Sequence, residues 1–368
     1  MRVHLLYLLL ALLLPTQIKA QAAAEKSDRQ VPSVTDPCQG GWDLPMEVTQ
    51  KADHLQDEVL QPGAQQLLDQ LRQVRNTSLA RNAGMVSATD QVLLDQLSNA
   101  LHTSSPNSFE AHMAGYYAQF PTPGAFQQLE LAMLRDMDRA ELIAPRLVNA
   151  ARKGNTTELA LRAKDMKAHG HIAPALYAMA DDILASLEPG AVLFAAGEMD
   201  AYPLWVEQYA GGRHKDVLVI DQRLLADPAY RTRIWERTQA RGEVAGQLNY
   251  INALATATTR PVYLSLALGN PTMAPLKDRL YVTGLAMRLS NTPVNNMPLI
   301  EARWHRLKKP MDAGPLSKNY LVPGVVLLTY YRAQGDELRA SRLEQEVRTM
   351  AKALGVTDEL VKNGILHH

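Results

Sequence analysis

The sequence is poor in cysteine and has no surplus of charge of either sign. Its 368 residues include a single Cys, which excludes an internal disulfide and a metal site built from several Cys thiolates. Lys and Arg number 38, and Asp and Glu also number 38, so the formal net charge is zero. Proteins that bind nucleic acid usually carry a basic surplus that faces the phosphate backbone. We therefore expect no nucleic-acid partner.

Glycine-rich loops and nucleophile motifs are missing as well. A dinucleotide-binding turn needs the pattern G-x-G-x-x-G, so that backbone amides can approach the pyrophosphate. Here Gly197 stands alone and is followed by Glu198 and Asp200, which would repel a phosphate. Asp221 ends a predicted strand, where a ribose-binding acid would lie, but the phosphate loop is lacking. No G-x-S-x-G elbow occurs either. The sequence predicts no cofactor and favours a non-catalytic protein.

Long apolar runs are absent except at the N-terminus. Arg2 is followed by ten unbroken apolar residues, Leu5 to Leu14, and then by Pro15. This pattern is typical of a cleaved secretory signal peptide. A membrane anchor is the alternative, but a spanning helix needs about 20 apolar residues. We expect an exported protein, periplasmic or secreted, that does not span a membrane after cleavage.

The rest of the chain divides by pattern into helical and α/β parts. "SFEAHMAGYYAQF" and "GAFQQLELAMLRD" predict an antiparallel helical pair, and a second pair is broken at Gly154-Asn155. The units begin about every 31 to 32 residues, close to the roughly 34-residue period of tetratricopeptide (TPR) repeats. The predicted organisation is a signal peptide at 1–20, a flexible leader at 21–42, TPR-like helical pairs at 43–188, an α/β Rossmann-like domain at 189–300, and a linker with a C-terminal TPR-like helical pair at 301–368.

Apolar strands alternate with helices between residues 191 and 268. The run "AVLFAA" at 191–196 is continuous, as in a strand buried on both faces, and "DVLVID" and "PVYLSLAL" follow after helical stretches. Strands separated by helices predict a parallel sheet with right-handed crossovers. "LYVTGLAMRL" predicts a fourth strand or an edge element. The fold class is therefore α/β plus α, with a parallel Rossmann-like sheet of three to four strands flanked by TPR-like helical pairs.

Polar residues follow these strands, where the carboxyl ends of parallel strands form one ligand-binding rim. The turn "GEMDAYP" at 197–203 places two carboxylates after the first strand. Carboxylates suit a cation, a sugar hydroxyl or a peptide amine better than an anion. The candidate ligand-binding residues are Gly197, Glu198, Asp200, Tyr202, Asp221 and Asn270. The candidate catalytic residues are Glu198, Asp200 and Asp221.

Several of these side chains have a structural alternative. Asp200 could cap a helix that begins near Pro203, which would leave Glu198 to meet the ligand. Tyr202 and Trp205 could pack in the core instead of stacking on a sugar. The acidic turn can therefore be interpreted in two ways: its carboxylates bind a ligand, or Asp200 orders the start of the helix and only Glu198 meets the ligand.

Two further features could carry chemistry. His169 and His171 flank a Gly at a predicted helix break, without a third ligand nearby in the sequence. We interpret them as solvated loop residues, so no metal site is predicted. Cys38 lies in the predicted flexible leader, so nucleophilic catalysis has no support from the sequence.

Two segments carry a further pattern, residues 191 to 231 and the later element "DRLYVTGLAMRLSNTP". The positions that carry it in the first segment are Leu193, Phe194, Gly197, Asp200, Pro203, Leu204, Trp205, Gln208, Gly212, Arg213, Asp216, Val217, Val219, Leu224 and Leu225. Those in the second are Leu280, Tyr281, Gly284, Leu285, Arg288 and Leu289. At these positions the chain resembles a bacterial family of multi-spanning membrane proteins of unknown function that is related to protein O-mannosyltransferases.

The resemblance implies the extramembrane portion of such proteins without their membrane helices, which hold the transferase chemistry. We therefore expect an exported, non-catalytic protein of the cell envelope that binds a protein partner or a glycan-related ligand. The alternative is a carbohydrate- or peptide-active enzyme that uses the acidic rim of Glu198, Asp200 and Asp221. In that alternative the carboxylates serve as acid–base groups or metal ligands.

Overall fold

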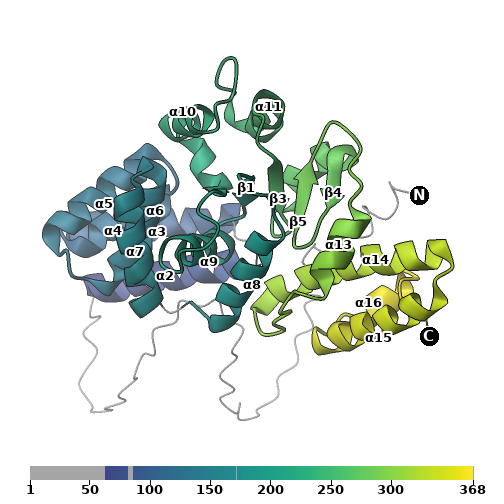
Figure 1. The fold of residues 1–368 in the computed structure, drawn as a ribbon. Coiled ribbons are helices and arrows are strands. Elements are labelled where there is room, and N and C mark those ends of the chain that lie inside the picture. Colours follow the sequence, from purple (N-terminus) through teal and green to yellow (C-terminus); the bar gives the residue numbers. More distant parts are fainter. Residues whose placement is uncertain (1–62, 82–85, 171, 368) are drawn as a thin grey trace, which may run out of the picture.

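One five-stranded sheet, flanked by helices, organises the computed structural model, which describes residues 63–81, 86–170 and 172–367 (Figure 1). The predicted signal peptide, the leader and Cys38 lie outside the described residues. Within the described ranges, every helix is too short or too polar to cross a bilayer.

Seven helices precede the sheet in the described part of the chain. Serine, threonine or asparagine caps four of them, because the side chains of Ser87, Ser108, Thr122 and Asn155 each accept a hydrogen bond from a first-turn amide. The helices are α2 (Ala64–Arg81), α3 (Ala88–Ser104), α4 (Phe109–Gln119), α5 (Pro123–Arg135), α6 (Ile143–Lys153), α7 (Thr156–His169) and α8 (Pro174–Ala185).

The two expected helical pairs are formed by neighbouring helices. Helix α4 packs against α5, and α6 packs against α7 after a left-handed Gly154 at the break. The next helix, α8, packs against α9 (Glu198–Tyr209), which belongs to the α/β region. The helices thus pair locally, and a regular TPR arrangement is still only an expectation.

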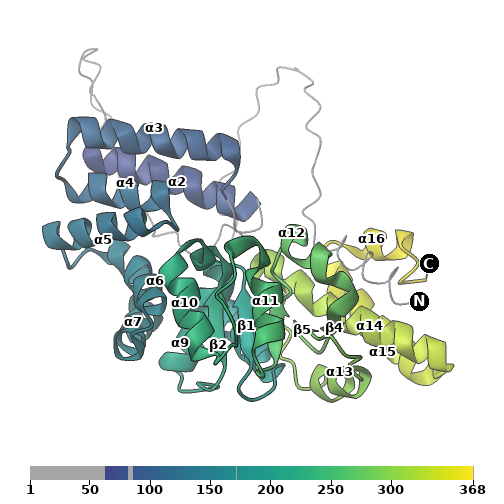
Figure 2. The same ribbon diagram turned by 90° about the horizontal axis from the view of Figure 1, so that it is seen from above.

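The three expected strands are parallel and lie in the order β2-β1-β3. They are β1 (Val192–Ala195), β2 (Leu218–Asp221) and β3 (Val262–Ser265), and every residue in them is buried. Helices α8 and α9 lie on one face of the sheet, while α10 (Pro228–Arg237) and α11 (Tyr250–Ala257) lie on the other (Figures 1 and 2). Helices on both faces explain why these strands are continuously apolar.

The prediction of a wholly parallel sheet was wrong at one edge. "LYVTGLAMRL" forms two strands, β4 (Leu280–Val282) and β5 (Ala286–Leu289), and β5 runs antiparallel to both β3 and β4. The chain reverses at Gly284, whose φ of 140° is a conformation that other residues rarely adopt. A side chain there would also collide with Ser186, since a Cβ would lie 2.5 Å from its Oγ.

Helices complete the chain after the sheet. The C-terminal pair is α14 (Leu321–Gln334) and α15 (Glu337–Ala353), joined by left-handed Gly335 and the capping residue Asp336. The remaining helices are α12 (Asn270–Met273), α13 (Met297–Trp304) and α16 (Thr357–Lys362), with 3-10 turns η1 (Ala140–Leu142), η2 (Gln222–Ala226), η3 (Gln247–Asn249), η4 (Ala274–Arg279) and η5 (Gly314–Tyr320).

Candidate functional site

The carboxyl ends of the three parallel strands meet at one edge of the sheet. Gly197 and Glu198 follow β1 closely, Asp221 is the last residue of β2, and Ser265 is the last residue of β3. Open α/β sheets bind their ligands at this edge. The sequence prediction that the turns after the strands gather here is consistent with this arrangement.

Gly197 forms the turn between β1 and α9. Its φ of 137° and ψ of −149° lie in a region that is essentially restricted to glycine. A Cβ at this position would lie 3.1 Å from Arg223 Nε and 3.2 Å from its Cζ. Glycine therefore allows the Arg223 guanidinium to lie directly against the turn.

Arg223 is fixed by Asp221, two residues before it. Its Nη2 donates to Asp221 Oδ2 at 2.6 Å, and its Nε lies 3.1 Å from both carboxylate oxygens. Such paired contacts between guanidinium and carboxylate are stronger than neutral hydrogen bonds. Because the Asp221 side chain is completely buried, it acts as the anchor that orients Arg223.

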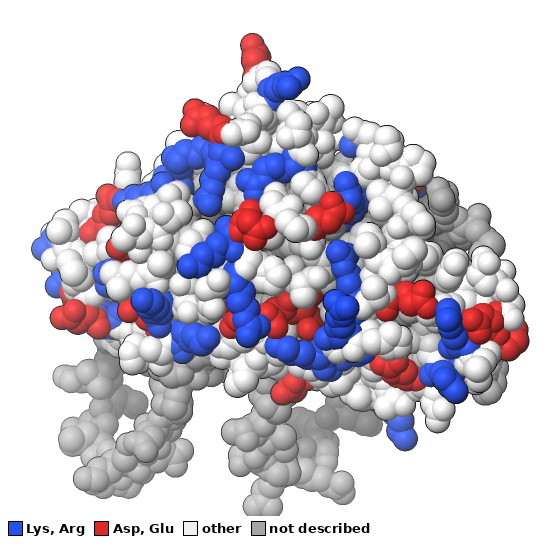
Figure 3. Space-filling model, in the orientation of Figure 1, with Lys and Arg blue, Asp and Glu red and all other residues white. Residues whose placement is uncertain are grey.

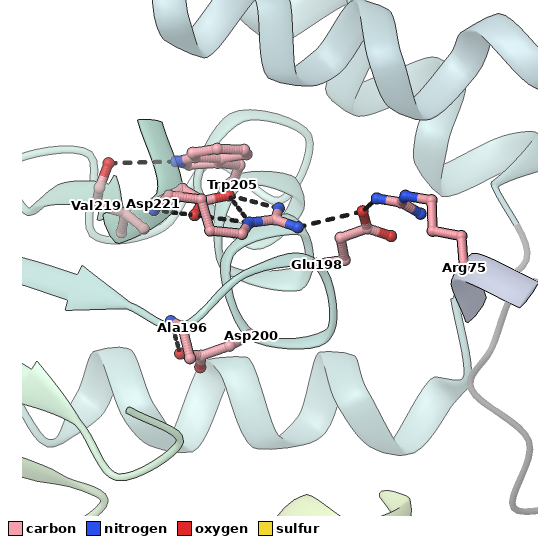
Figure 4. A network of polar contacts seen from close by, with 8 residues as sticks. Arg75, Ala196, Glu198, Asp200, Trp205, Val219 and Asp221 are labelled. Carbon is pink, nitrogen blue, oxygen red and sulfur yellow. Dashed lines mark hydrogen bonds and ion pairs between the residues drawn. The ribbon is translucent and has the colours of Figure 1, made fainter. Parts of the chain in front are cut away.

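Glu198 lies between two arginines from distant parts of the chain (Figure 4). Its Oε1 accepts from Arg223 Nη1 at 3.3 Å and from Arg75 Nη2, which comes from α2. Burial opposes the charge on Glu198, but Arg75 and Arg223 outweigh it, so the pKa of Glu198 lies below its ordinary value. Glu198 is therefore a stabilised carboxylate and not a free one.

Aromatic rings surround this charged network. The Arg75 guanidinium lies 5.0 Å from the centre of the Tyr117 ring, and that of Arg223 lies 4.8 Å from the centre of Phe120. Both contacts are within cation–π range. Tyr202 stacks on Trp205 with ring centres 5.8 Å apart, and burial raises the pKa of Tyr202 far above its ordinary value.

Asp200 faces a different direction from Glu198 (Figure 4). Helix α9 begins at Glu198 and not near Pro203, so Asp200 belongs to its first turn. The Asp200 carboxylate accepts a hydrogen bond from the Ala196 amide at 2.8 Å. Burial raises the pKa of Asp200 to about 6, although the Ala196 amide and Ser265 lower it in part. Asp200 thus orders the turn by reaching back to the strand.

A pocket of about 80 Å³ opens where α2 and α4 meet the start of α6 and the start of α9. We call it the tyrosine–arginine pocket. Its lining residues are Arg72, Arg75, Asn76, Tyr116, Tyr117, Ala140, Glu141, Ile143, Ala144, Pro145, His169, Gly170, Glu198 and Tyr202.

Several polar groups in this pocket have spare binding capacity. Among the described residues, Arg72 forms one ion pair, at 3.6 Å with Asp69, and the hydroxyls of Tyr116 and Tyr117 have no hydrogen-bond partner. Burial raises the pKa of both tyrosines, so the hydroxyls stay neutral donors. Glu141, by contrast, is paired with Arg139 at 2.7 Å.

The predicted site residues take different places around the pocket. Glu198 and Tyr202 line it, while Gly197 and Asp221 support it through Arg223. Asp200 is absent from the lining.

Asn270 opens the short helix α12 and is also absent from the pocket lining. The same helix is tied to the turn after β2, because Thr272 Oγ1 donates to Gln222 Oε1 at 3.1 Å. His169 lines the pocket and His171 lies outside the described residues. Among the described residues, no cluster of three His, Cys, Asp or Glu side chains could hold a metal.

Sequence reasoning missed the residues contributed by the helical region. Arg75 comes from α2, and Tyr116 and Tyr117 come from α4. Nothing in their local sequence marks them, since each occupies an ordinary helical position. Only the packing of α2 and α4 over the sheet edge brings them to Glu198.

Comparison with known proteins gives one similarity, over part of this region. Residues 176–250 match the family model described as TMEM260-associated domain 2. The search of curated proteins and the search of solved structures each gave no match. The matched segment contains Glu198, Asp200, Asp221 and Arg223, whereas Arg75 lies outside it. This chain is therefore similar to a TMEM260-associated domain over β1, α9 and β2.

Proposed function

We propose that this protein is an exported binding protein and that a glycan-related ligand enters the tyrosine–arginine pocket. The observation that carries the proposal is the convergence of three tyrosines with arginine, asparagine and glutamate side chains on one opening. Ligand sites in proteins combine apolar surface with a few well-placed polar groups in this way. A sugar ring offers the matching surface, because its C–H face is apolar and its hydroxyls are donors and acceptors.

The size of the pocket allows a small polar group to enter. Its volume of about 80 Å³ is several times the roughly 10–15 Å³ that one water needs. Arg72 and Asn76 lie one helical turn apart on α2 and can both donate to ligand hydroxyls. Tyr117 supplies both a ring and a free hydroxyl.

The geometry favours binding over acid–base catalysis. Arg75 and Arg223 hold Glu198 in its charged form, which makes it a poor proton donor. Asp221 is completely buried against Arg223. Asp200 has a pKa suited to proton transfer, but it lies outside the pocket lining. The enzyme alternative therefore has less support than the binding proposal.

The family comparisons support a glycan-related setting. The match over 176–250 is to a TMEM260-associated domain, and the resemblance to O-mannosyltransferase-like membrane proteins implies an extramembrane portion of such proteins. We infer that this chain shares their ligand surroundings and not their transferase chemistry. The apolar run before Pro15 supports export to the envelope.

The test is a saccharide panel monitored by saturation-transfer NMR and by tryptophan fluorescence. Trp205 stacks on Tyr202, which lines the pocket, so its emission should respond to occupancy. We expect at least one of mannose, glucose, N-acetylglucosamine or galacturonate to bind. Tyr117→Ala and Arg72→Gln should each weaken that binding about tenfold or more.

Matched controls separate the pocket from general effects. Tyr330→Ala changes a tyrosine of α14, and Arg306→Gln changes an exposed arginine after α13. Both should bind saccharide like the wild type. Absence of binding across the panel, or unchanged binding in Tyr117→Ala and Arg72→Gln, would overturn the proposal. Capture of one defined envelope protein through the same pocket would then favour a protein partner.

A further inference from the structure

A second hollow lies at the other end of α9. It has a volume of about 40 Å³ and is bordered by the end of α6, the start of α7, the end of α9, strand β2 and helix α10. Three arginines line it, Arg152, Arg233 and Arg237, and no Asp or Glu belongs to the lining. We call it the arginine pocket. It shares no lining residue with the tyrosine–arginine pocket.

Only one of the three arginines is neutralised. Arg152 Nε donates to Asp227 Oδ2 at 2.7 Å, and its guanidinium lies 4.2 Å from the centre of the Phe126 ring. Arg233 donates from Nη2 to the Arg152 carbonyl, and its buried Nε has no partner among the described residues. The Arg237 side chain forms no hydrogen bond or ion pair with any residue that the structure describes. Two positive charges therefore remain uncompensated at the hollow.

The start of α7 adds to the positive potential. Thr156 is the first residue of this 14-residue helix and lines the hollow. The amides of a first helical turn have no intrahelical acceptor, and the helix dipole is positive at this end. The Asn155 cap takes up the Glu158 amide, which leaves the amide of Thr156 without an acceptor inside the helix.

The surrounding surface is basic. Lys and Arg side chains gather over the junction of α10 with α6 (Figure 3). The positive charge of Arg237 also acts on Arg260. Burial is the main cause that lowers the pKa of Arg260, and repulsion by Arg237 lowers it further. Uncompensated arginines of this kind attract anions from solution.

We propose that the arginine pocket binds a tetrahedral oxyanion, phosphate or sulfate, either free or as the end group of a larger ligand. Guanidinium groups match such oxyanions with paired N–H donors. The volume of about 40 Å³ exceeds the roughly 10–15 Å³ that one water needs, so a small anion can enter the hollow. The proposal is independent of the saccharide proposal, because the two pockets have different linings.

The first experiment measures binding of inorganic phosphate and of inorganic sulfate to the full chain by calorimetry, at constant ionic strength set with chloride. We expect saturable binding of one oxyanion per chain. Arg237→Gln should weaken it at least tenfold, and this variant should fold normally because Arg237 is exposed and its side chain forms no hydrogen bond or ion pair with the described residues. Arg306→Gln, which removes one positive charge elsewhere, should bind like the wild type.

Two further probes identify the source of the oxyanion. Glucose 1-phosphate tests a phosphorylated small molecule, and vesicles with phosphatidylglycerol test a lipid headgroup; binding of either that is lost in Arg237→Gln supports the proposal. No saturable binding of phosphate or sulfate would overturn it. An equal loss in Arg306→Gln and Arg237→Gln would also overturn it, since that result indicates general charge attraction. Vesicle binding that is unchanged in Arg237→Gln would likewise indicate general charge attraction and would overturn the proposal.

Discussion

Arg75 of α2 donates to Glu198 of α9 although 123 residues separate them in the chain (Figure 4). Both side chains are nearly buried, with 8% and 12% of their side-chain surface exposed. The pair therefore links the N-terminal helices to the turn that follows β1. Removing one partner from a buried ion pair leaves an uncompensated charge, which destabilises a fold more than removing both.

The first prediction concerns this pair. Glu198→Gln should lower the free energy of unfolding by about 3 kcal/mol, because Arg75 loses its counter-charge and Arg223 keeps only that of Asp221. The double variant Arg75→Gln/Glu198→Gln should be more stable than the sum of the single effects by about 1 kcal/mol or more. Urea unfolding at pH 7.5 measures all three variants. Strict additivity would contradict the coupling.

The second prediction concerns Asp200 and pH. Its pKa is about 6 in the folded protein and 3.8 ordinarily, so the folded state binds more protons between about pH 4 and 6. The stabilising effect of this proton is complete below about pH 4 and is lost as the pH rises through 6. Two pKa units correspond to about 3 kcal/mol. Asp200→Asn should therefore raise the free energy of unfolding at pH 7.5 by up to about 3 kcal/mol.

The comparison of pH profiles provides the control. The advantage of Asp200→Asn over the wild type should disappear at about pH 4 and below, because both side chains are then neutral. Glu198 has a lowered pKa, so its contribution is present above pH 4.5 and is lost as the pH falls further. The two variants should therefore show opposite dependences. A pH-independent effect of Asp200→Asn would contradict the buried-carboxyl interpretation.

The third prediction concerns the turn glycine. Gly197→Ala should cost about 3 kcal/mol or more, because a residue with a side chain is strained at this φ and ψ and because its Cβ would press on Arg223. Gly212→Ala is the matched control, with a φ of 78° and open space around the added Cβ. It should cost only about 1 kcal/mol. Similar losses in both would show that the contact with Arg223 contributes nothing.

The fourth prediction tests the shape of the Arg223 side chain. A lysine cannot contact Asp221 through two nitrogens and reach Glu198 at the same time. Arg223→Lys should lower the free energy of unfolding by about 2 kcal/mol. Arg213→Lys changes an exposed arginine that pairs with Asp181, and it should change stability by less than about 1 kcal/mol. Equal stability of Arg223→Lys and the wild type would argue against a role for the paired contacts.

The parts of the fold that are local in sequence could be predicted. Continuous apolar runs identified β1, β2 and β3, and the helices between them indicated that these three strands run parallel to one another. The hairpin of β4 and β5 was missed. The ten-residue segment "LYVTGLAMRL" has the pattern of one strand, and nothing in that pattern indicates that the chain reverses at Gly284. Pattern gives the strands but not the direction of an edge strand.

The candidate site was predictable only on the side of the sheet. Glu198 and Asp221 could be placed at one rim, since the ends of parallel strands meet there. Arg75 could not, because an arginine on a helix is normally exposed and only tertiary packing buries this one. The sequence interpretation left Glu198 free to meet a ligand, whereas in the structure its carboxylate is paired with Arg75. Residues that balance a buried charge can come from anywhere in the chain.

The origin of Arg75 also bears on how this protein can be divided. A fragment cut to the limits of the matched domain, residues 176–250, keeps Arg223 beside Glu198 but omits the α2 guanidinium. It also removes Tyr116 and Tyr117 of α4, which line the tyrosine–arginine pocket together with Glu198. Expression and crystallisation of the α/β region therefore require a polypeptide that starts before Ala64, so that it includes both α2 and the sheet.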